Sequence, residues 1–193
     1  MNWLLEENAR EAHRRRLFRD AAEEEQMLLM RHPLSACRAY ALFGMLLGTL
    51  PPAMIFVRIF GYGMSPRFSD TLLFLILCLF MNIACCAMGR TMGRVLSRTL
   101  EDMERWSWSK MLLVLPFMGA AWGSVTGAVG GLVFFFFGAF FGLVCALPVG
   151  ILAFTIFTPL HRLVARGGMI DARHFWPLAC GVTMMISALI LGI

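Results

Sequence analysis

Residues 111–160 read MLLVLPFMGAAWGSVTGAVGGLVFFFFGAFFGLVCALPVGILAFTIFTPL, which is fifty residues without a single Asp, Glu, Lys, Arg or His. A bilayer core of about 30 Å takes about 20 helical residues per crossing, so this stretch is long enough for two spans and a turn. It therefore predicts a helical hairpin in a membrane. The two spans are expected at residues 111–129 and 132–158, with the turn at Gly130-Gly131.

The whole chain has the composition of a membrane protein. Hydrophobic residues make up 59% and charged residues 15% of its 193 residues, which leaves too little polar surface for a soluble domain. The first 38 residues hold seven Arg and seven acidic residues, so the net charge of +5 comes from the short loops downstream. This distribution indicates membrane topology and argues against nucleic-acid binding. The six Cys lie in or beside apolar stretches, and neither a metal site nor a cofactor is expected.

We expect an all-α polytopic transmembrane bundle of about five spans in residues 36–193. The remaining spans are predicted at residues 39–60, 71–88 and 175–193. Residues 89–110 carry five cations and an apolar face, which indicates either an amphipathic cytoplasmic segment or a continuation of the second span. This segment offers a surface to a partner or to anionic lipid. Its predicted interfacial residues are Arg90, Arg94, Arg98, Trp106 and Trp108.

The expected topology follows from the cations. In the five-span arrangement nearly all of them fall on one side, which places the N-terminus in the cytoplasm and the C-terminus outside. Residues 1–35 are predicted to form a cytoplasmic amphipathic helix, either solvated or docked on a cytoplasmic partner. They contain neither an apolar leader segment nor the acid-poor composition of a transit peptide, so a bacterial inner membrane is the expected location.

Pro51 and Pro52 lie in the middle of the first predicted span. Two proline rings remove two backbone donors and crowd the preceding turn, so the helix is expected to kink or break there. Broken helices at membrane depth can bind ions or substrates. A structural kink is the simpler interpretation, because no internal repeat supplies a matching break.

Small residues recur at every fourth position of both hairpin spans. In lipid, small residues let two helix backbones approach closely, and the resulting contacts hold the helices together. The rows either pack the hairpin against itself or join the chain to another subunit, and Leu at Gly127 or Gly142 is expected to disrupt folding or assembly. Successive positions wind around the helix by about 40°, which favours a right-handed crossing at roughly that angle, whereas a flat parallel pairing would use only part of each row. The rows are Gly119, Gly123, Gly127 and Gly131, and then Gly138, Gly142, Ala146 and Gly150.

The predicted spans contain no Asp, Glu or Lys, which argues against a proton relay or an ion-coupled transporter. The only polar cluster of the kind that enzymes use is His161, Asp171, Arg173 and His174, and its spacing is more typical of a loop contact than of a catalytic dyad. We therefore expect no enzyme activity and no catalytic residue.

The expected function is that of a non-catalytic subunit or scaffold of a multi-subunit membrane complex, assembled through the glycine-rich faces. Its partners would be other membrane subunits or copies of itself, together with lipid. The alternative is a homo-oligomeric channel or pore with glycine-lined helices around an axis. An enzyme that uses the His161 cluster is a third and weaker alternative.

Overall fold

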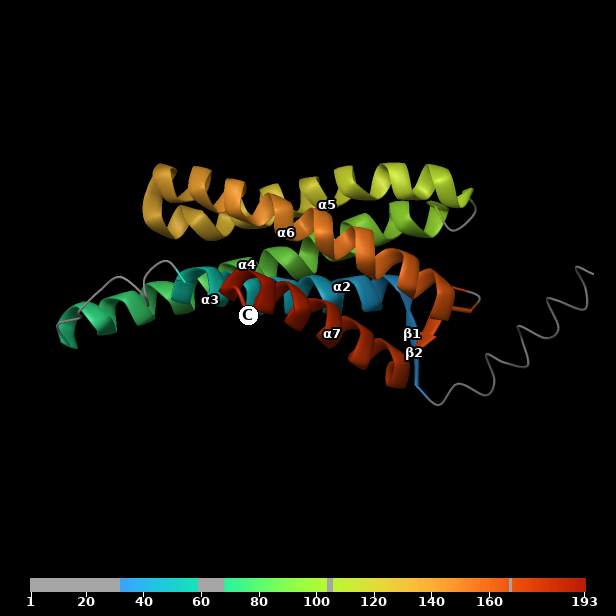
Figure 1. The fold of residues 1–193 in the computed structure, drawn as a ribbon, viewed down its shortest axis with the longest axis horizontal. Helices are drawn as coiled ribbons and strands as arrows, with labels where there is room; N and C mark the ends of the chain where they lie inside the picture. Colours follow the sequence, from blue (N-terminus) through green and yellow to red (C-terminus); the bar gives the residue numbers. More distant parts are fainter. Residues whose placement is uncertain (1–31, 59–67, 104–105, 167) are drawn as a thin grey trace, which may run out of the picture.

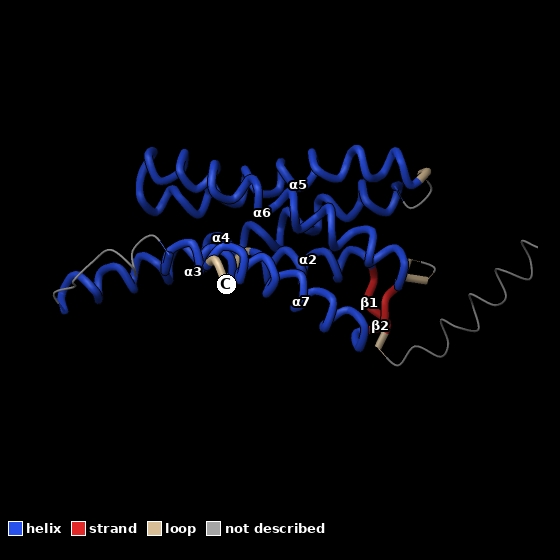
Figure 2. Tube along the Cα trace, viewed as in Figure 1, coloured by secondary structure: helices blue, strands red, loops and turns tan. Residues whose placement is uncertain are grey.

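The structure is a computed structural model that describes residues 32–58, 68–103, 106–166 and 168–193. Most of the predicted N-terminal helix at residues 1–35 lies outside the described residues. The all-helical prediction is confirmed for the described part of the chain, apart from two strands of three residues each (Figure 2). These strands carry no periodic pattern that could have revealed them.

The helices begin and end close to the expected positions. Four stretches are long and apolar enough to cross a membrane, and the third of them, Trp108–Val164, contains two helices. The helices are α2 (Ala36–Leu47), α3 (Leu50–Phe56), α4 (Phe68–Met103), α5 (Trp108–Gly131), α6 (Phe135–Val164) and α7 (Ala172–Leu191), with a short 3-10 helix η2 (Leu132–Phe134).

The second predicted span and most of residues 89–110 form the single helix α4, which is the continuation that the sequence left open, and no proline interrupts it. The hairpin turn is not at Gly130-Gly131, which lie inside α5, but in η2 and Phe135. Gly131 is needed on the helix face that packs against Gly138, so the chain turns after it, and Phe135 takes the positive φ of 62°.

The helices form a bundle with two main layers (Figure 1). The antiparallel helices α5 and α6 lie on one side, and α2, α3 and α7 lie on the other. Helix α4 packs along α2 and also contacts α5, and its N-terminal part projects beyond the other helices at one end of the bundle (Figure 1).

Aromatic side chains fill the space between the layers. Phe43 of α2 stacks on Phe157 of α6, with ring centroids 3.7 Å apart and planes 10° apart. Tyr40 meets the same Phe157 edge to face, and Phe175 of α7 also contacts this ring edge to face. Trp122 of α5 completes the core and is 1% exposed. These rings hold the two layers together.

A small antiparallel sheet closes one end of the bundle. Strand β1 (Pro33–Ser35) precedes α2 and pairs with β2 (Met169–Asp171), which precedes α7. Ser35 and Asp171 then cap the two helices that follow, since their side chains accept hydrogen bonds from the backbone N–H groups of Arg38 and Arg173. The sheet thus sets the start of two helices at once.

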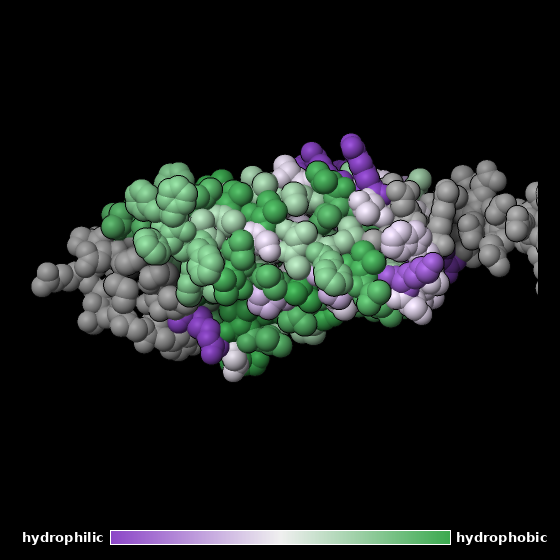
Figure 3. Space-filling view, turned by 90° about the horizontal axis from the view of Figure 1, so that it is seen from above, coloured by the Kyte–Doolittle hydropathy of each residue, from purple (hydrophilic) through white to green (hydrophobic). Residues whose placement is uncertain are grey.

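The outer surface of the hairpin is apolar over most of its length. Figure 3 views this face and shows hydrophobic residues across the middle and hydrophilic residues mainly at the end near the strands. Phe135, Phe136 and Phe137 at the tip are more than 80% exposed. Such a surface suits acyl chains, as expected for a membrane helix pair.

Candidate functional site

The two predicted glycine rows lie against each other along the whole hairpin. Gly119 faces Gly150 across the interface, and the remaining pairs follow in antiparallel register: Gly123 with Ala146, Gly127 with Gly142, and Gly131 with Gly138. At each glycine a Cβ would collide with the backbone carbonyl of its partner. We call this interface the α5–α6 seam.

The α5–α6 seam matches one of the two interpretations of the rows, in which the hairpin packs against itself. All four levels of both rows are used, so no part of either row is left free. Both rows are also occupied inside one chain, and neither is left open to another subunit. Any assembly surface of this protein must therefore lie elsewhere.

A second glycine interface, which we call the α2–α4 seam, was missed in the sequence. Gly44 faces Gly89, Gly48 faces Cys85, and Gly93 faces Tyr40, again in antiparallel register. The signal was present as two i,i+4 glycine pairs, Gly44 with Gly48 and Gly89 with Gly93. Trp122 of α5 lies over this interface and donates its Nε1–H to the carbonyl of Gly89 at 3.3 Å.

The Pro51-Pro52 pair lies at the start of α3, and the helix breaks just before it, between Leu47 and Leu50. Helix α3 is directed toward the far end of α7, where the Arg58 guanidinium donates to the carbonyl of Ile190 at 2.6 Å. The break therefore separates the first predicted span into two helices that pack against different partners.

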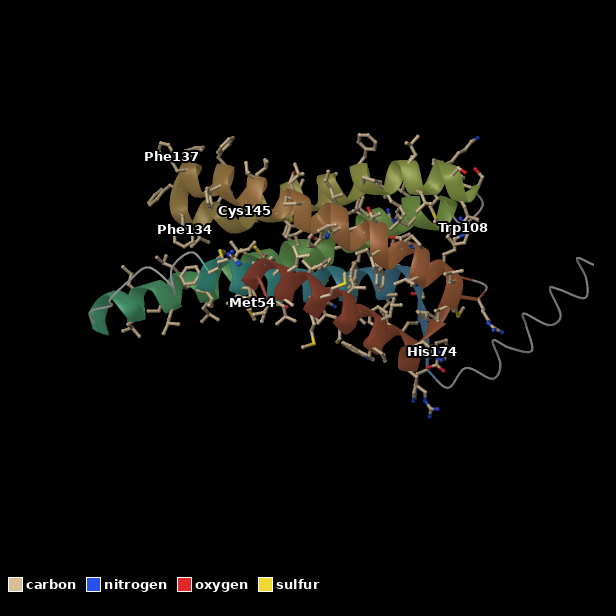
Figure 4. All side chains as sticks on the ribbon, in the orientation of Figure 1. Met54, Trp108, Phe134, Phe137, Cys145 and His174 are labelled. Carbon is tan, nitrogen blue, oxygen red and sulfur yellow. The ribbon has the colours of Figure 1, made fainter. Side chains whose placement is uncertain are left out.

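An apolar cavity of about 390 Å³ lies between this break and the hairpin. Pro51, Pro52 and Phe56 line it on one side, and Gly127, Gly142 and Cys145 on the other. Figure 4 shows Phe134 pointing from the hairpin toward α3, while Phe137 points outward at the tip. The rings of Phe134 and Phe56 lie 6.5 Å apart at this cavity.

The cavity is lined mainly by apolar groups. Its polar neighbours include the Cys85 thiol, which donates weakly to the carbonyl of Thr126 at 3.7 Å, and the Cys145 thiol. A cavity of this size and lining can hold an apolar chain. Its described lining contains no acid–base pair and no nucleophile beside a base, so it supplies no catalytic group to such a chain.

A second hollow runs along the outer side of α2 and α4, and we call it the α2–α4 groove. Its volume is about 690 Å³. Met45 and Thr49 line it from α2, and α4 contributes a continuous face that begins at Leu79 and ends at Arg94. The predicted interfacial residues Arg90 and Arg94 are thereby placed together at one end of a hollow.

The other predicted interfacial residues lie at the same end of the bundle. Arg162 of α6 places its guanidinium 4.7 Å from the centre of the Trp108 ring and donates to the carbonyl of Trp106 at 3.0 Å. Both tryptophans are about two-fifths exposed. Arg98 is exposed on α4. This aromatic and basic belt is typical of a membrane–water interface.

The structure does not assemble the polar cluster of His161, Asp171, Arg173 and His174. His161 is buried among rings, 5.1 Å from that of Tyr40 and 5.7 Å from that of Phe157, whereas Asp171 caps α7 and His174 is exposed. Within the described residues, no group of three or more His, Cys, Asp or Glu could hold a metal ion.

No family model, curated protein or solved structure matches this chain. The features of the chain that bear on its function are therefore the two seams, the cavity and the exposed helix surfaces.

Proposed function

We propose that the chain is a non-catalytic integral membrane subunit or scaffold of a multi-subunit membrane complex. The observation that carries this proposal is the N-terminal part of α4. From Phe68 through Ala84 none of the described side chains is buried, although this part of the helix is rich in large apolar residues. Figure 1 shows it projecting past the rest of the bundle.

The exposed residues cover a broad face of this part of α4. Leu72, Leu75 and Phe80 are each 53–60% exposed, and Ile76 between them is 43% exposed. A helix without internal neighbours gains van der Waals contact when a partner helix packs on it, and this contact is the main source of helix association in lipid. We place the assembly surface here, because the glycine rows are already occupied.

A homo-oligomeric channel or pore is the second candidate, and the same observations weigh against it. Packed aromatic rings occupy space between the layers, and the glycine-rich helix faces that were expected to line an axis pack on each other. A pore would have to form between copies from other surfaces, such as the exposed face of α4.

The arrangement of the helices supports five crossings with alternating direction. Helices α4 and α6 end, and α2, α5 and α7 begin, at the end of the bundle that holds the strands (Figure 1). Most described cations lie at this end, which supports a cytoplasmic N-terminus and an outer C-terminus, and the location that we propose is a bacterial inner membrane. The described cations away from this end include Arg58.

The proposal is tested by photo-crosslinking in the native membrane. A photoreactive amino acid at Leu75, which lies outside the lining of the α2–α4 groove, is expected to capture a protein partner in fixed ratio, and the same probe at Leu113 of α5, which is 71% exposed, serves as the matched control. Native mass spectrometry of the extracted complex then gives its composition.

Each result of this experiment decides between the candidates. Additional chains of another mass support a hetero-oligomeric complex. A whole-number multiple of the single-chain mass, together with conductance of the purified protein in a bilayer, supports the pore. A monomer that gives no protein adduct at Leu75 contradicts both proposals.

A further inference from the structure

The α2–α4 groove changes from apolar to cationic along its length. At one end it is lined by Leu79 and Ile83 of α4 and by Met45 of α2, and at the other end by Arg90 and Arg94. The two arginines are one helical turn apart and share a face, so their guanidinium groups can approach one ligand together.

The guanidinium groups of Arg90 and Arg94 have no counter-charge in the described structure. Both side chains are exposed, and neither makes a hydrogen bond or an ion pair in the part of the chain that the structure describes. The groove lining contains no Asp or Glu among its described residues. Two cations held beside a span without an acidic partner favour an anionic ligand.

The length of the groove matches a single lipid leaflet. Arg94 lies fifteen residues after Leu79, which is about 22 Å along a helix at a rise of 1.5 Å per residue. Half of a bilayer with its headgroup regions is also about 20–22 Å thick. A ligand with its charge at the arginines and its apolar part at Leu79 therefore has the dimensions of a phospholipid.

The third cation near this end comes from α2. Arg38 lies seven residues before Met45, so it is on the same face of α2 as the groove residue and two turns closer to the strand end. In the α2–α4 seam Tyr40 faces Gly93, which places Arg38 at the level of the Arg94 turn. The positive charge at the groove entrance is thus supplied from both helices.

We propose that the α2–α4 groove binds one anionic phospholipid. Its phosphate contacts Arg90 and Arg94, and one acyl chain lies along Met45, Ile83 and Leu79. Basic hollows between spans on the cytoplasmic side recognise anionic headgroups by this chemistry. The site does not depend on the partner subunit proposed above, because every lining residue belongs to this chain.

Native mass spectrometry of the purified full chain in detergent tests this site. We expect one phosphatidylglycerol to bind in preference to phosphatidylcholine with the same acyl chains. The double variant Arg90→Gln/Arg94→Gln is expected to weaken phosphatidylglycerol binding about tenfold or more, because charge-assisted contacts to the phosphate are lost. Phosphatidylcholine binding is expected to change little.

A matched control removes the same charge elsewhere at the same end of the bundle. Arg166→Gln/Arg173→Gln changes two exposed arginines outside the groove and is expected to leave lipid binding unchanged. Ile83→Trp keeps both groove arginines and is expected to weaken binding by filling the acyl-chain end. Both variants change exposed side chains, so folding is preserved.

Four results would overturn the proposal. The first is equal binding of the two lipids, and the second is an equal loss in the Arg166/Arg173 variant, which would indicate general attraction to negative charge. The third is displacement of phosphatidylglycerol by inorganic phosphate at millimolar concentration, since a simple anion site would not need the acyl chain. A photoreactive probe at Ile83 that captures protein in place of lipid would also contradict it.

Discussion

The glycines of the two seams are required for close packing and not for backbone freedom. Gly123 and Gly142 have ordinary helical conformations. Glycine is required at both positions because a backbone carbonyl of the facing helix lies where a Cβ would be. A methyl group at either position forces the helices apart along the whole hairpin, because the contact is to backbone and not to a flexible side chain.

Alanine at a seam glycine is therefore expected to destabilise the fold. Gly123→Ala and Gly142→Ala should each lower the free energy of unfolding by about 1–3 kcal/mol, the typical cost of an overpacked core. Gly181→Ala in α7 is the matched control, since an added Cβ there would meet no described neighbour within 4 Å. It should be neutral or stabilising by up to about 1 kcal/mol. Chemical denaturation in detergent distinguishes them, and equal effects would refute the packing argument.

Trp122 joins three helices at one residue. Its ring packs over Gly44 and Gly89, and its indole N–H reaches the carbonyl of Gly89. Trp122→Phe is expected to lower the free energy of unfolding by about 1–3 kcal/mol through a lost hydrogen bond and a small cavity. Trp176→Phe, at a position that is 43% exposed, should cost less. Thermal unfolding of both variants would show the difference, and a larger loss at Trp176 would contradict this role.

At the level of single residues, the sequence revealed which positions need to be small but not which helices they join. The rows from Gly119 to Gly150 predicted close approach, and their pairing within the hairpin was one of two open interpretations. The pairs Gly44 with Gly48 and Gly89 with Gly93 were equally visible. A small residue indicates that some backbone lies close, and only the three-dimensional arrangement identifies that backbone.

Among the helices, single prolines and the proline pair have different effects. Pro116 lies inside α5 and Pro177 inside α7 without ending either helix. In contrast, the chain breaks at Gly48-Thr49, directly before Pro51 and Pro52. The combination of two missing donors with a preceding glycine is what ends the helix, because the carbonyls of this turn lose successive partners.

Restoring the donors should join the two helices. In Pro51→Ala/Pro52→Ala we expect slower hydrogen exchange of the Leu50 and Ala53 amides and protection of the two new amides at residues 51 and 52, since the carbonyls before them regain helical partners. The contact between Arg58 and Ile190 should weaken as α3 changes direction. Pro116→Ala is the control and should alter exchange in α5 only slightly. Unchanged exchange in the double variant would show that packing, and not proline, sets the break.

The positions of the helices could be predicted from hydropathy, but several of their ends could not. Helix α4 continues past Met88 because its second half is amphipathic and packs on α2, so the hydropathy of the segment falls while the helix goes on. The turn follows Gly131 and is not formed by it, because this glycine packs against Gly138 of the facing helix. The strands are too short for any periodic signal.

For the molecule as a whole, the distribution of charge is the main guide to orientation. The described cations at the end with the strands include Arg38, Arg98, Lys110, Arg166 and Arg173, which lie near the helix ends that meet there. Hydropathy predicted where the crossings lie along the chain, and this charge bias predicted their direction. The neighbours of each helix and the α2–α4 groove could not be predicted, because they depend on contacts between residues far apart in the sequence.

Reporter fusions test the proposed orientation. Alkaline phosphatase, which is active only outside the cytoplasm, should be active when fused after Ile193 and inactive when fused after Arg166. Green fluorescent protein at the same two positions should give the opposite result. The physical reason is the retention of Arg-rich segments on the cytoplasmic side. Active phosphatase after Arg166 would invalidate the five-span topology.

The pairing of β1 with β2 has a consequence for biosynthesis. Pro33–Ser35 is made early, but its partner Met169–Asp171 leaves the ribosome only after helices α2 to α6 have been synthesised. Until then the strand before α2 has no partner and α2 has no contact with α7, so the packing around α2 is incomplete in the membrane. The last segment of the chain thus completes the first, and a chain that stops before residue 169 has no means to close the bundle.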